Sequence, residues 1–528
     1  MQAVHDSGEN FSFEWRMQQL HSLQTMMRNH WDEICEALHE DLGKQKVEAV
    51  ATELILVMND LSFTMHNLKS WMKRRNVPSP GILFPSFSYI EPRPLRGPAV
   101  LIIGPFNYPI LLTLAPALGA LAAGNPVVLK PSELSASVSQ LLQRIVPLHF
   151  EKSAVAVVTG GVPESTALLA RPWGKIFLTG SPATGQLIAA AAAKTLTPVV
   201  LELGGKTPAY LDDSTVGCMQ QVANRIVWSR FLNCGQTCVA VDTVILSETL
   251  LGQFLPAVKQ ALREQLGDDP AAAMGRIVSQ KHAERLVKLL QQVEEVILET
   301  DDASKKKITK ILVGGSKLCD TENRFIYPTV VLNPPADSRL MKEEIFGPIL
   351  PIVSVKSRTE AVACMRQLPG TPLALYVFTD SEATLNEVRQ QVPAGTVVRN
   401  DAVMQIASHH IPFGGLGTSG YGTYHGKHSF ECFSHLQPIL HRLCGPGADL
   451  GGLRYPPFSA SKEWLVYTVL GRCPDIPVLF TRARTTAIVT TVACSVMQCV
   501  PPWRKLFWNA VLSCLEAAAD GVRGMLKA

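Results

Sequence analysis

The sequence of 528 residues contains no CxxC pair and no group of cysteines and histidines with the spacing of a zinc site. Twelve cysteines do not make a disulfide scaffold in a chain this long, so we expect neither a disulfide framework nor a metal centre. The first residues, 1–10, are polar and acidic and lack the apolar stretch of a secretory signal. We therefore expect a reducing compartment, the cytoplasm, where a free reactive thiol persists.

An excess of charge of one sign is also missing. Lys and Arg number 49 against 45 Asp and Glu, and no dense basic patch with interleaved aromatic residues occurs. Nucleic acid is therefore not an expected partner. Charged residues make up 18% of the chain and hydrophobic residues 47%, which excludes bulk disorder and indicates a well-buried protein of several domains.

Short apolar runs alternate with helical segments in the first half of the chain. Residues 11–75 have apolar positions at helical spacing, whereas residues 81–96 contain three prolines and predict an irregular extended segment. The expected strands lie at 99–103, 127–129, 154–158 and 175–178, and the expected helices at 110–123, 136–146 and 185–194. This order predicts an open parallel α/β sheet with right-handed crossovers.

The alternation restarts after a Gly-Gly pair at 204–205 and predicts a second α/β unit. Its expected helices lie at 219–228, 250–266, 280–298, 359–367 and 382–391, and its strands at 244–246, 311–313, 349–355 and 374–378. The glycine-rich stretch 412–426 is expected to be a loop before a returning strand. The fold class is therefore α/β.

Two residues have side chains suited to covalent catalysis. Glu202 follows an apolar run in LELGGK, and Cys238 ends the segment NCGQTC. A thiolate that attacks a carbonyl, and a separate carboxylate that activates water, are what an acyl-enzyme route requires. Each residue also has a structural alternative: Cys238 as a buried structural thiol, and Glu202 as a strand-end carboxylate paired with Lys206.

A third polar residue follows the first expected strand. Asn107 lies in GPFNYP, directly after the apolar run 99–103. Ligands bind at the carboxyl ends of parallel strands, and an amide there is able to donate to a developing oxyanion. The alternative is that Asn107 is only a turn residue.

Candidate cofactor contacts follow two other strands. Gly180, Ser181 and Gly185 belong to a segment that opens a helix, and the backbone N–H groups of such a terminus suit a pyrophosphate. The segment matches neither GxGxxG nor a Walker loop. Lys130 and Glu133 are able to hydrogen-bond a ribose, although Glu133 also suits a helix start.

Taken together, the ordered segments resemble the aldehyde dehydrogenase superfamily, and within it the class 3 branch. The resemblance covers roughly residues 11–457 and rests on GPFNYP at 104–109, LKPSE at 129–133, LTGS at 178–181, LELGGK at 201–206, NCGQTC at 233–238, EEIFGPIL at 343–350 and PFGGLGTSG at 412–420. The segments YHGKHSF at 424–430 and LRYPP at 453–457 resemble the class 3 branch in particular.

The resemblance implies a role for each catalytic candidate. Cys238 matches the nucleophile that forms a thiohemiacetal with an aldehyde. Asn107 matches the side chain that holds the oxyanion together with the Cys238 backbone N–H. Glu202 matches the base that activates the water for hydrolysis of the thioester.

The resemblance also implies NAD as cofactor, with NADP as a second option. Lys130 and Glu133 match contacts to the adenosine ribose, and the segment from Gly180 through Ser181 to Gly185 matches the pyrophosphate site. Glu133 would repel the extra phosphate of NADP, which favours NAD. Two further residues, Glu344 and Phe346, match contacts to the nicotinamide ribose and ring.

The implied activity is NAD(P)-dependent oxidation of medium- or long-chain aliphatic, or aromatic, aldehydes to carboxylic acids by a homodimer. One alternative is a non-catalytic structural or binding protein with the same fold, against which Cys238 and Glu202 argue. The other is a relative that passes the thioester to coenzyme A, which Glu202 disfavours.

The implied architecture has a Rossmann-like cofactor domain, an α/β catalytic domain and a small bridging sheet for oligomerisation. Residues 11–80 and 97–203 are assigned to the NAD(P)-binding domain, 204–401 to the catalytic domain, 81–96 and 402–445 to the bridging segment, and 446–528 to a C-terminal tail. The cofactor and substrate would then meet between the first two domains.

Three residues depart from the class 3 pattern. Val241 and Thr243 stand where members usually have proline and an aromatic residue, which would alter the loop beside Cys238. Arg399 occupies a position that is usually small. Near the site it would favour an acidic substrate or obstruct the pocket, whereas a solvent-facing Arg399 would do neither. We expect activity to be retained, because none of the three has a proposed chemical role.

The tail from residue 458 shows no resemblance to the family. Nineteen uncharged residues between Arg484 and Arg504 approach the length of a bilayer span, although their threonines and the Pro501-Pro502 pair make it a poor one. Aromatic and basic residues beyond this segment suit a membrane interface, and the four tail cysteines are candidate palmitoylation sites. The tail is thus expected either to contact the cytosolic face of a membrane, such as the endoplasmic reticulum, or to be a loosely packed extension.

Overall fold

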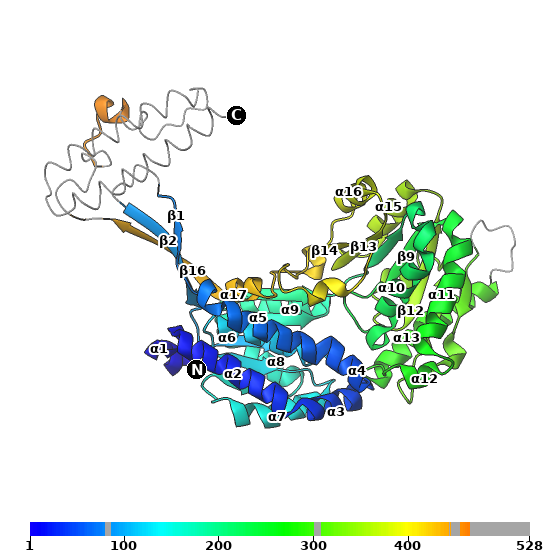
Figure 1. The fold of residues 1–528 in the computed structure, drawn as a ribbon, viewed down its shortest axis with the longest axis horizontal. Helices are drawn as coiled ribbons and strands as arrows, with labels where there is room; N and C mark the ends of the chain where they lie inside the picture. The colour runs from blue at the N-terminus through cyan, green and yellow to red at the C-terminus, as the bar shows by residue number, and fades with distance from the viewer. Residues whose placement is uncertain (80–85, 300–307, 443, 445–454, 465–528) are drawn as a thin grey trace, which may run out of the picture. The chain divides into compact units, whose positions relative to one another are not determined.

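The computed structural model describes residues 1–79, 86–299, 308–442, 444 and 455–464 (Figure 1). The chain divides into two compact units. The larger unit contains Met1–Lys73 and Pro92–Gln437, and the smaller one contains Arg74–Glu91 and the described residues from Pro438 onward. All candidate site residues belong to the larger unit, which is built around two α/β sheets.

The first sheet of the larger unit has six strands. In spatial order they are β15 (Gly420–Tyr421), β7 (Val199–Leu203), β6 (Lys175–Gly180), β3 (Val100–Ile103), β4 (Val127–Lys130) and β5 (Val155–Val157), and all are parallel except β15. The residues of β3 and β4 are buried throughout, as expected for strands covered on both faces. The prediction of a parallel, Rossmann-like α/β sheet is confirmed.

Alternate residues of this sheet pack into two separate cores. Val100 and Ile102 of β3 contact the core formed with α2 (Phe13–Asn29), α3 (Trp31–Leu42), α5 (Ile55–Trp71), α6 (Leu111–Ala122) and α7 (Ala136–His149). Leu101 and Ile103 contact the other core, formed with α8 (Val162–Leu169) and α9 (Pro182–Ala193). The period of two along the strand therefore explains why helices are needed on both faces.

The second sheet has seven strands. Their order is β10 (Lys310–Val313), β11 (Thr329–Leu332), β12 (Ile349–Val355), β9 (Thr243–Ser247), β8 (Pro208–Leu211), β13 (Ala374–Phe378) and β14 (Thr396–Arg399), and β10 alone is antiparallel. The helices of this half include α10 (Met219–Phe231), α11 (Leu251–Leu266), α13 (Gln280–Glu299), α15 (Arg358–Gln367) and α16 (Glu382–Gln391). The strands β8, β11 and β14 are not among the predicted ones, although β3, β4 and β10, which have the same length, are.

A third sheet has the order β1 (Arg75–Val77), β2 (Ser86–Pro94) and β16 (Ser434–Arg442). The prediction of an irregular segment at 81–96 is wrong for residues 86–94, which form a regular strand. The residues of β2 that pair with β1 run from Ser88 to Ile90 and precede both prolines of the strand. Proline lacks a backbone N–H group, and neither proline lies where β1 needs such a donor.

The glycine-rich segment is not entirely loop, contrary to prediction. Its strand β15 pairs with β7, and Gly420 lies opposite Glu202. Gly420 has φ +120°, and a Cβ there would lie 1.8 Å from the carbonyl oxygen of Leu201. Only glycine allows this approach, which brings a segment from the end of the larger unit against the strand that carries Glu202.

The candidate membrane segment between Arg484 and Arg504 lies outside the described residues. The four tail cysteines, Cys473, Cys494, Cys499 and Cys514, also lie outside them. Within the described part of the chain, no helix has both the length and the apolar character needed to cross a membrane.

Candidate active site

Two cavities of the larger unit meet at Cys238 and Glu202. The first, here called the cleft, has a volume of about 1000 Å³ and runs past the carboxyl ends of β3, β4 and β6. The second, here called the pocket, is lined mainly by apolar and aromatic side chains. Thr179, Glu202 and Cys238 line both cavities. The structure thus brings together the sulfur and the carboxylate that the sequence singled out.

Cys238 follows a tight turn after α10. Asn233, Cys234 and Gly235 have φ values of 51°, 54° and 74°, all in the left-handed region. A Cβ at Gly235 would lie 2.3 Å from the carbonyl oxygen of Gly347, so this position requires glycine. Such strained backbone persists only where its surroundings hold it, and it is common at functional sites.

The two cysteines of this segment have different environments. Cys238 is partly exposed and lines both cavities, whereas Cys234 is buried and lines neither. Burial raises the pKa of the Cys238 thiol to about 12, and the carboxyl groups of Glu344 and Glu202 act in the same direction. The thiol is therefore protonated at neutral pH in this arrangement. The alternative of a buried structural thiol describes Cys234 rather than Cys238.

Glu202 lies near the end of β7 and is 3% exposed. Neither of its carboxyl oxygens has a hydrogen-bond partner among the described residues, and burial raises its pKa well above the usual value. The alternative pairing with Lys206 is wrong, because the Lys206 ammonium contacts Asp242 and donates to the carbonyl oxygen of Leu340 at 2.8 Å. A buried carboxyl without partners is unfavourable for folding, which is typical of a functional group.

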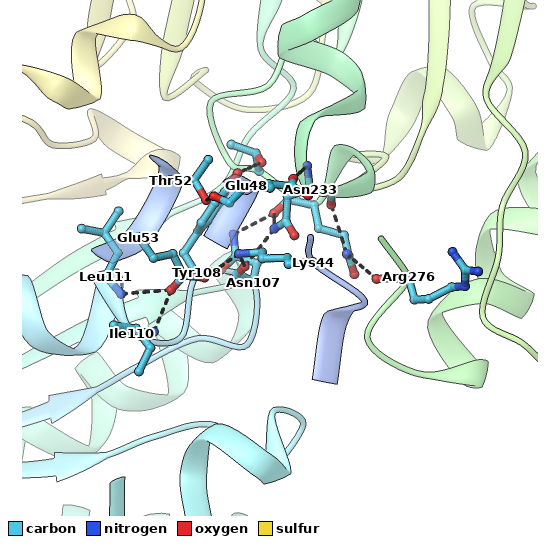
Figure 2. Close-up of polar contacts among 12 residues, drawn as sticks. Lys44, Glu48, Thr52, Glu53, Asn107, Tyr108, Ile110, Leu111, Asn233 and Arg276 are labelled. Atoms are coloured by element: carbon cyan, nitrogen blue, oxygen red, sulfur yellow. Dashed lines mark hydrogen bonds and ion pairs between the residues drawn. The ribbon is translucent and has the colours of Figure 1, made fainter. Parts of the chain in front are cut away.

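Asn107 lines the cleft. Hydrogen bonds hold both its side chain and its backbone carbonyl (Figure 2). Its side-chain Nδ2 donates to the carbonyl oxygen of Gln236 at 2.9 Å, close to Cys238 in the chain. Its own carbonyl oxygen accepts from Lys44 Nζ at 3.0 Å and from Asn233 Nδ2 at 2.8 Å. Asn107 therefore does more than form a turn, since it ties the end of β3 to the segment before Cys238.

A buried ion pair that the sequence analysis did not identify supports Asn107 (Figure 2). The side chains of Lys44 and Glu53 are fully buried, with Nζ and Oε1 2.5 Å apart. The other oxygen of Glu53 accepts from the backbone N–H groups of Ile110 and Leu111, at 2.8 and 3.1 Å. Glu53 thus balances both the ammonium and the positive N-terminus of α6. Removing one partner of such a pair leaves an uncompensated charge, which typically costs about 3–5 kcal/mol.

The backbone that carries Glu53 explains why sequence reasoning missed it. Residues Val50–Leu54 form a π-helical turn between α4 (Lys46–Ala49) and α5. A π turn changes the helical period locally and is frequent at functional sites, but it has no reliable sequence signature. Glu48, just before this turn, accepts the backbone N–H of Asn233 at 2.7 Å. The only sequence signal for a functional role was that Glu53 is a charged residue in an otherwise apolar part of a helical segment.

The cleft begins at the N-terminus of α9. This helix starts at Pro182, rather than at residue 185 as predicted, and Ser181 caps it by accepting the backbone N–H of Thr184. Free backbone N–H groups of such a terminus suit a phosphate group. Gly180 and Ser181 line the cleft, but Gly185 does not. A Cβ at Gly185 would lie 2.9 Å from Leu203, so this glycine allows α9 to pack against β7.

Lys130 and Glu133 lie together in the cleft. Their Nζ and Oε2 atoms are 3.0 Å apart, and both residues line the cavity. Although burial alone would raise the pKa of Glu133, a backbone hydrogen bond and Lys130 outweigh this effect and lower it. Glu133 is therefore a carboxylate at neutral pH.

The inner end of the cleft contains Glu344 and Phe346. A Cβ at Gly204 would lie 2.1 Å from the Glu344 carboxyl group, so that glycine leaves room for it. Burial raises the pKa of Glu344 to about 8. A capped helix N-terminus, a polar pair, and a carboxyl with an aromatic ring, all lining one cleft, fit a dinucleotide. Among the described residues, no group of His, Cys, Asp and Glu side chains suits a metal ion.

The three departures from the family pattern lie away from both cavities. Val241 is fully buried, and its backbone N–H donates to Ser229 Oγ at 3.0 Å. Thr243 is also fully buried, at the start of β9. Arg399 is exposed and pairs with Glu382 at 3.0 Å. Arg399 therefore neither obstructs the pocket nor selects an acidic substrate.

Comparison with known proteins agrees with this geometry. The aldehyde dehydrogenase family matches residues 2–439. The chain is 41% identical to aldehyde dehydrogenase family 3 member H1 of Arabidopsis thaliana, over 87% of this chain and 90% of that protein. It is 40% identical to the human family 3 member B1, over 87% of this chain and 93% of that protein.

Among solved structures, Staphylococcus aureus AldH in its substrate-bound state is similar with a TM-score of 0.80. The two sequences are 35% identical, and the match covers 88% of this chain and 96% of the other. The chain therefore belongs to the aldehyde dehydrogenase family, with family 3 members as its relatives, and is an NAD(P)-dependent enzyme that oxidises aldehydes.

Proposed function

We propose that this enzyme oxidises medium- or long-chain aliphatic, or aromatic, aldehydes to carboxylic acids through a thioester on Cys238. The observation that carries the proposal is the junction of cleft and pocket at Cys238 and Glu202. The apolar lining of the pocket, which includes Leu111, Leu112 and Ile406, suits a hydrocarbon chain. Such a substrate class would connect the enzyme to lipid metabolism.

In the proposed reaction, the Cys238 thiol releases its proton to water, and the sulfur attacks the aldehyde carbon to form a thiohemiacetal whose oxygen is negative. The Asn107 amide and the Cys238 backbone N–H hold the negative oxygen that develops. Bound in the cleft, NAD(P) would supply the hydride acceptor for oxidation of the thiohemiacetal to a thioester. Glu202 then takes a proton from water, which attacks the thioester; its raised pKa makes it a stronger base than an exposed carboxylate.

The cleft residues hold the cofactor in this proposal. Lys130 and Glu133 would hold the adenosine ribose, the α9 terminus at Ser181 would hold the pyrophosphate, and Glu344 and Phe346 would hold the nicotinamide ribose and ring. Because the lowered pKa of Glu133 keeps it negative, it repels the extra phosphate of NADP. We therefore expect NAD to be preferred.

NADH formation from an aldehyde in the absence of coenzyme A tests the proposed function. Purified enzyme is offered short, long and aromatic aldehydes with NAD or NADP, and absorbance of the reduced cofactor is followed. We expect turnover without coenzyme A, with long-chain and aromatic aldehydes and NAD giving the highest kcat/KM. A requirement for coenzyme A would indicate the acyl-transferring alternative, and inactivity with every aldehyde would indicate a non-catalytic protein.

We further propose that the enzyme is a homodimer. Strand β16 lies at an edge of the three-stranded sheet and carries two exposed leucines, Leu436 and Leu440. An exposed edge strand with apolar side chains is a site where a second chain can add. Sedimentation equilibrium of the purified protein measures the mass of the assembly.

We also propose that the C-terminal tail attaches the enzyme to the cytosolic face of a membrane. The uncharged stretch between Arg484 and Arg504 and the aromatic and basic residues after it support this. A chain truncated after Pro457 is expected to move from the membrane fraction to the supernatant. If the truncated and full-length chains distribute alike on centrifugation, the tail is not an anchor.

A further inference from the structure

One carboxyl group interrupts the apolar lining of the pocket. Asp60 lies on α5 one turn after Leu56, so both residues line the pocket from the same face of the helix. Asp60 is 5% exposed, and its Oδ1 accepts no hydrogen bond from the described residues. The His409 ring nitrogen Nδ1 lies 3.6 Å from this oxygen, too far for a hydrogen bond. Asp60 therefore has an unused acceptor at the pocket wall.

Two carboxyl groups line the pocket. Asp60 and Glu202 line it, whereas no lysine or arginine of the described residues does. Burial lowers the pKa of His425 to about 4 and lowers that of His409 as well, so both rings are neutral at neutral pH. Burial raises the pKa of Asp60 to about 7, although a hydrogen bond from the Gly426 backbone opposes this. A cation beside Asp60 would stabilise its charged form.

Aromatic rings line the pocket together with Asp60. Phe413 and His425 stack with their centroids 5.2 Å apart, and Tyr424 packs edge-on against His425 at 4.5 Å and against Phe413 at 5.8 Å. The backbone of His425 has φ +89°, a conformation that a residue with a side chain rarely adopts. The fold thus holds this ring in place despite strain. Faces of aromatic rings attract cations, most strongly where water is excluded.

We propose that the pocket binds aldehydes that carry an ammonium or quaternary ammonium group on the end remote from the aldehyde, with Asp60 as its counter-ion. This inference rests on the proposed function, because the aldehyde carbon must reach Cys238 at the junction. Neutral hydrocarbon aldehydes fit the same apolar walls. Aldehydes that carry a second carboxylate are disfavoured, because they meet two acidic side chains and no basic one.

Matched aldehydes test this preference in the full-length enzyme with NAD. A homologous series of ω-trimethylammonio aldehydes is compared with neutral isosteres, in which a tert-butyl group replaces the trimethylammonium group, and with ω-carboxylate aldehydes of the same lengths. At the best chain length, kcat/KM for the cationic aldehyde is expected to exceed that of its isostere roughly tenfold or more. The carboxylate series is expected to be the poorest.

The variant Asp60→Asn removes the charge with little change in shape. We expect its cationic-to-neutral ratio of kcat/KM to fall to about one, mainly through a higher KM for the cationic aldehyde. Asp337→Asn is the matched control, since Asp337 is exposed and lines neither cavity, and it should keep the wild-type ratio. A lower melting temperature in Asp60→Asn with an unchanged ratio would mean that Asp60 is only structural, and would overturn the proposal.

The wild-type measurement decides the question even if Asp60→Asn does not fold. A cationic aldehyde that is oxidised no better than its isostere at any chain length contradicts the proposal. Oxidation of neutral aldehydes in that case still supports the proposed function. Inactivity with cationic and neutral aldehydes alike would instead contradict the proposed function itself, so the two failures are distinguishable.

Discussion

Replacement of Cys238 by alanine is expected to lower kcat for aldehyde oxidation by about 10⁴-fold or more, because no other group forms the covalent intermediate. Cys238 lines both cavities at their junction, where no other cysteine of the described residues lies. The measurement is NADH formation with saturating aldehyde and NAD. Binding of NAD, followed by quenching of protein fluorescence, should persist, since the cleft residues are unchanged.

Cys234→Ala is the matched control for this experiment. Cys234 is the nearest cysteine in the chain, but it is buried and lines neither cavity. Its removal is expected to lower stability slightly and to leave turnover within a few-fold of wild type. If Cys238→Ala keeps wild-type turnover, or if both variants lose activity equally with native melting temperatures, the covalent mechanism is wrong.

Glu202→Gln is expected to separate the two halves of the reaction. Attack by Cys238 and hydride transfer do not need the carboxylate, so a rapid burst of NADH should form in the first turnover. Hydrolysis of the thioester does need a base, and the steady-state rate is expected to fall by roughly 10²–10⁴-fold. Stopped-flow measurement of NADH resolves both phases. Glu151→Gln, an exposed carboxyl that lines neither cavity, serves as the control.

The pH dependence gives the same experiment a second readout. Glu202 acts as a base only when it is ionised, and burial raises its pKa. Hydrolysis in the wild type should therefore increase as pH rises through this elevated pKa, whereas Glu202→Gln should lose that dependence. Because both carboxyl oxygens are without partners in the described structure, the variant should be at least as stable as the wild type. If Glu202→Gln gives no burst of NADH, Glu202 is also needed before hydrolysis, and the proposed role in hydrolysis alone is wrong.

Much of the α/β architecture follows from local patterns. The segments predicted as strands at 99–103, 127–129 and 175–178 correspond to β3, β4 and β6, because strands buried on both faces are mostly apolar. The same patterns miss β8 and β14, which are no shorter than β3 and β4, so a short apolar run alone does not identify a strand. Their places are set by pairing with β13, which lies between them in the sheet.

Both chemical groups of the candidate site are recognisable before folding. Cys238 and Glu202 stand in short motifs with turn-forming glycines, and a thiol with a separate carboxylate already suggests a covalent reaction. The sequence does not show, however, that these two residues lie close together. Glu202 ends a strand of the first sheet, whereas Cys238 follows α10 in the second half of the unit. No local pattern specifies that these two elements line the same cavities.

The order of elements and the reacting groups are encoded locally, since apolar period and turn chemistry act over a few residues. The contacts that hold the catalytic residues in place, and those that shape the pocket, form only when the chain folds. Lys44 reaches the Asn107 carbonyl, Gly420 pairs opposite Glu202, and Asp60 approaches His409, each across a long separation in the chain. Such contacts depend on which faces of helices and sheets pack together, so the tertiary structure alone decides which buried charges are satisfied and which remain free for chemistry.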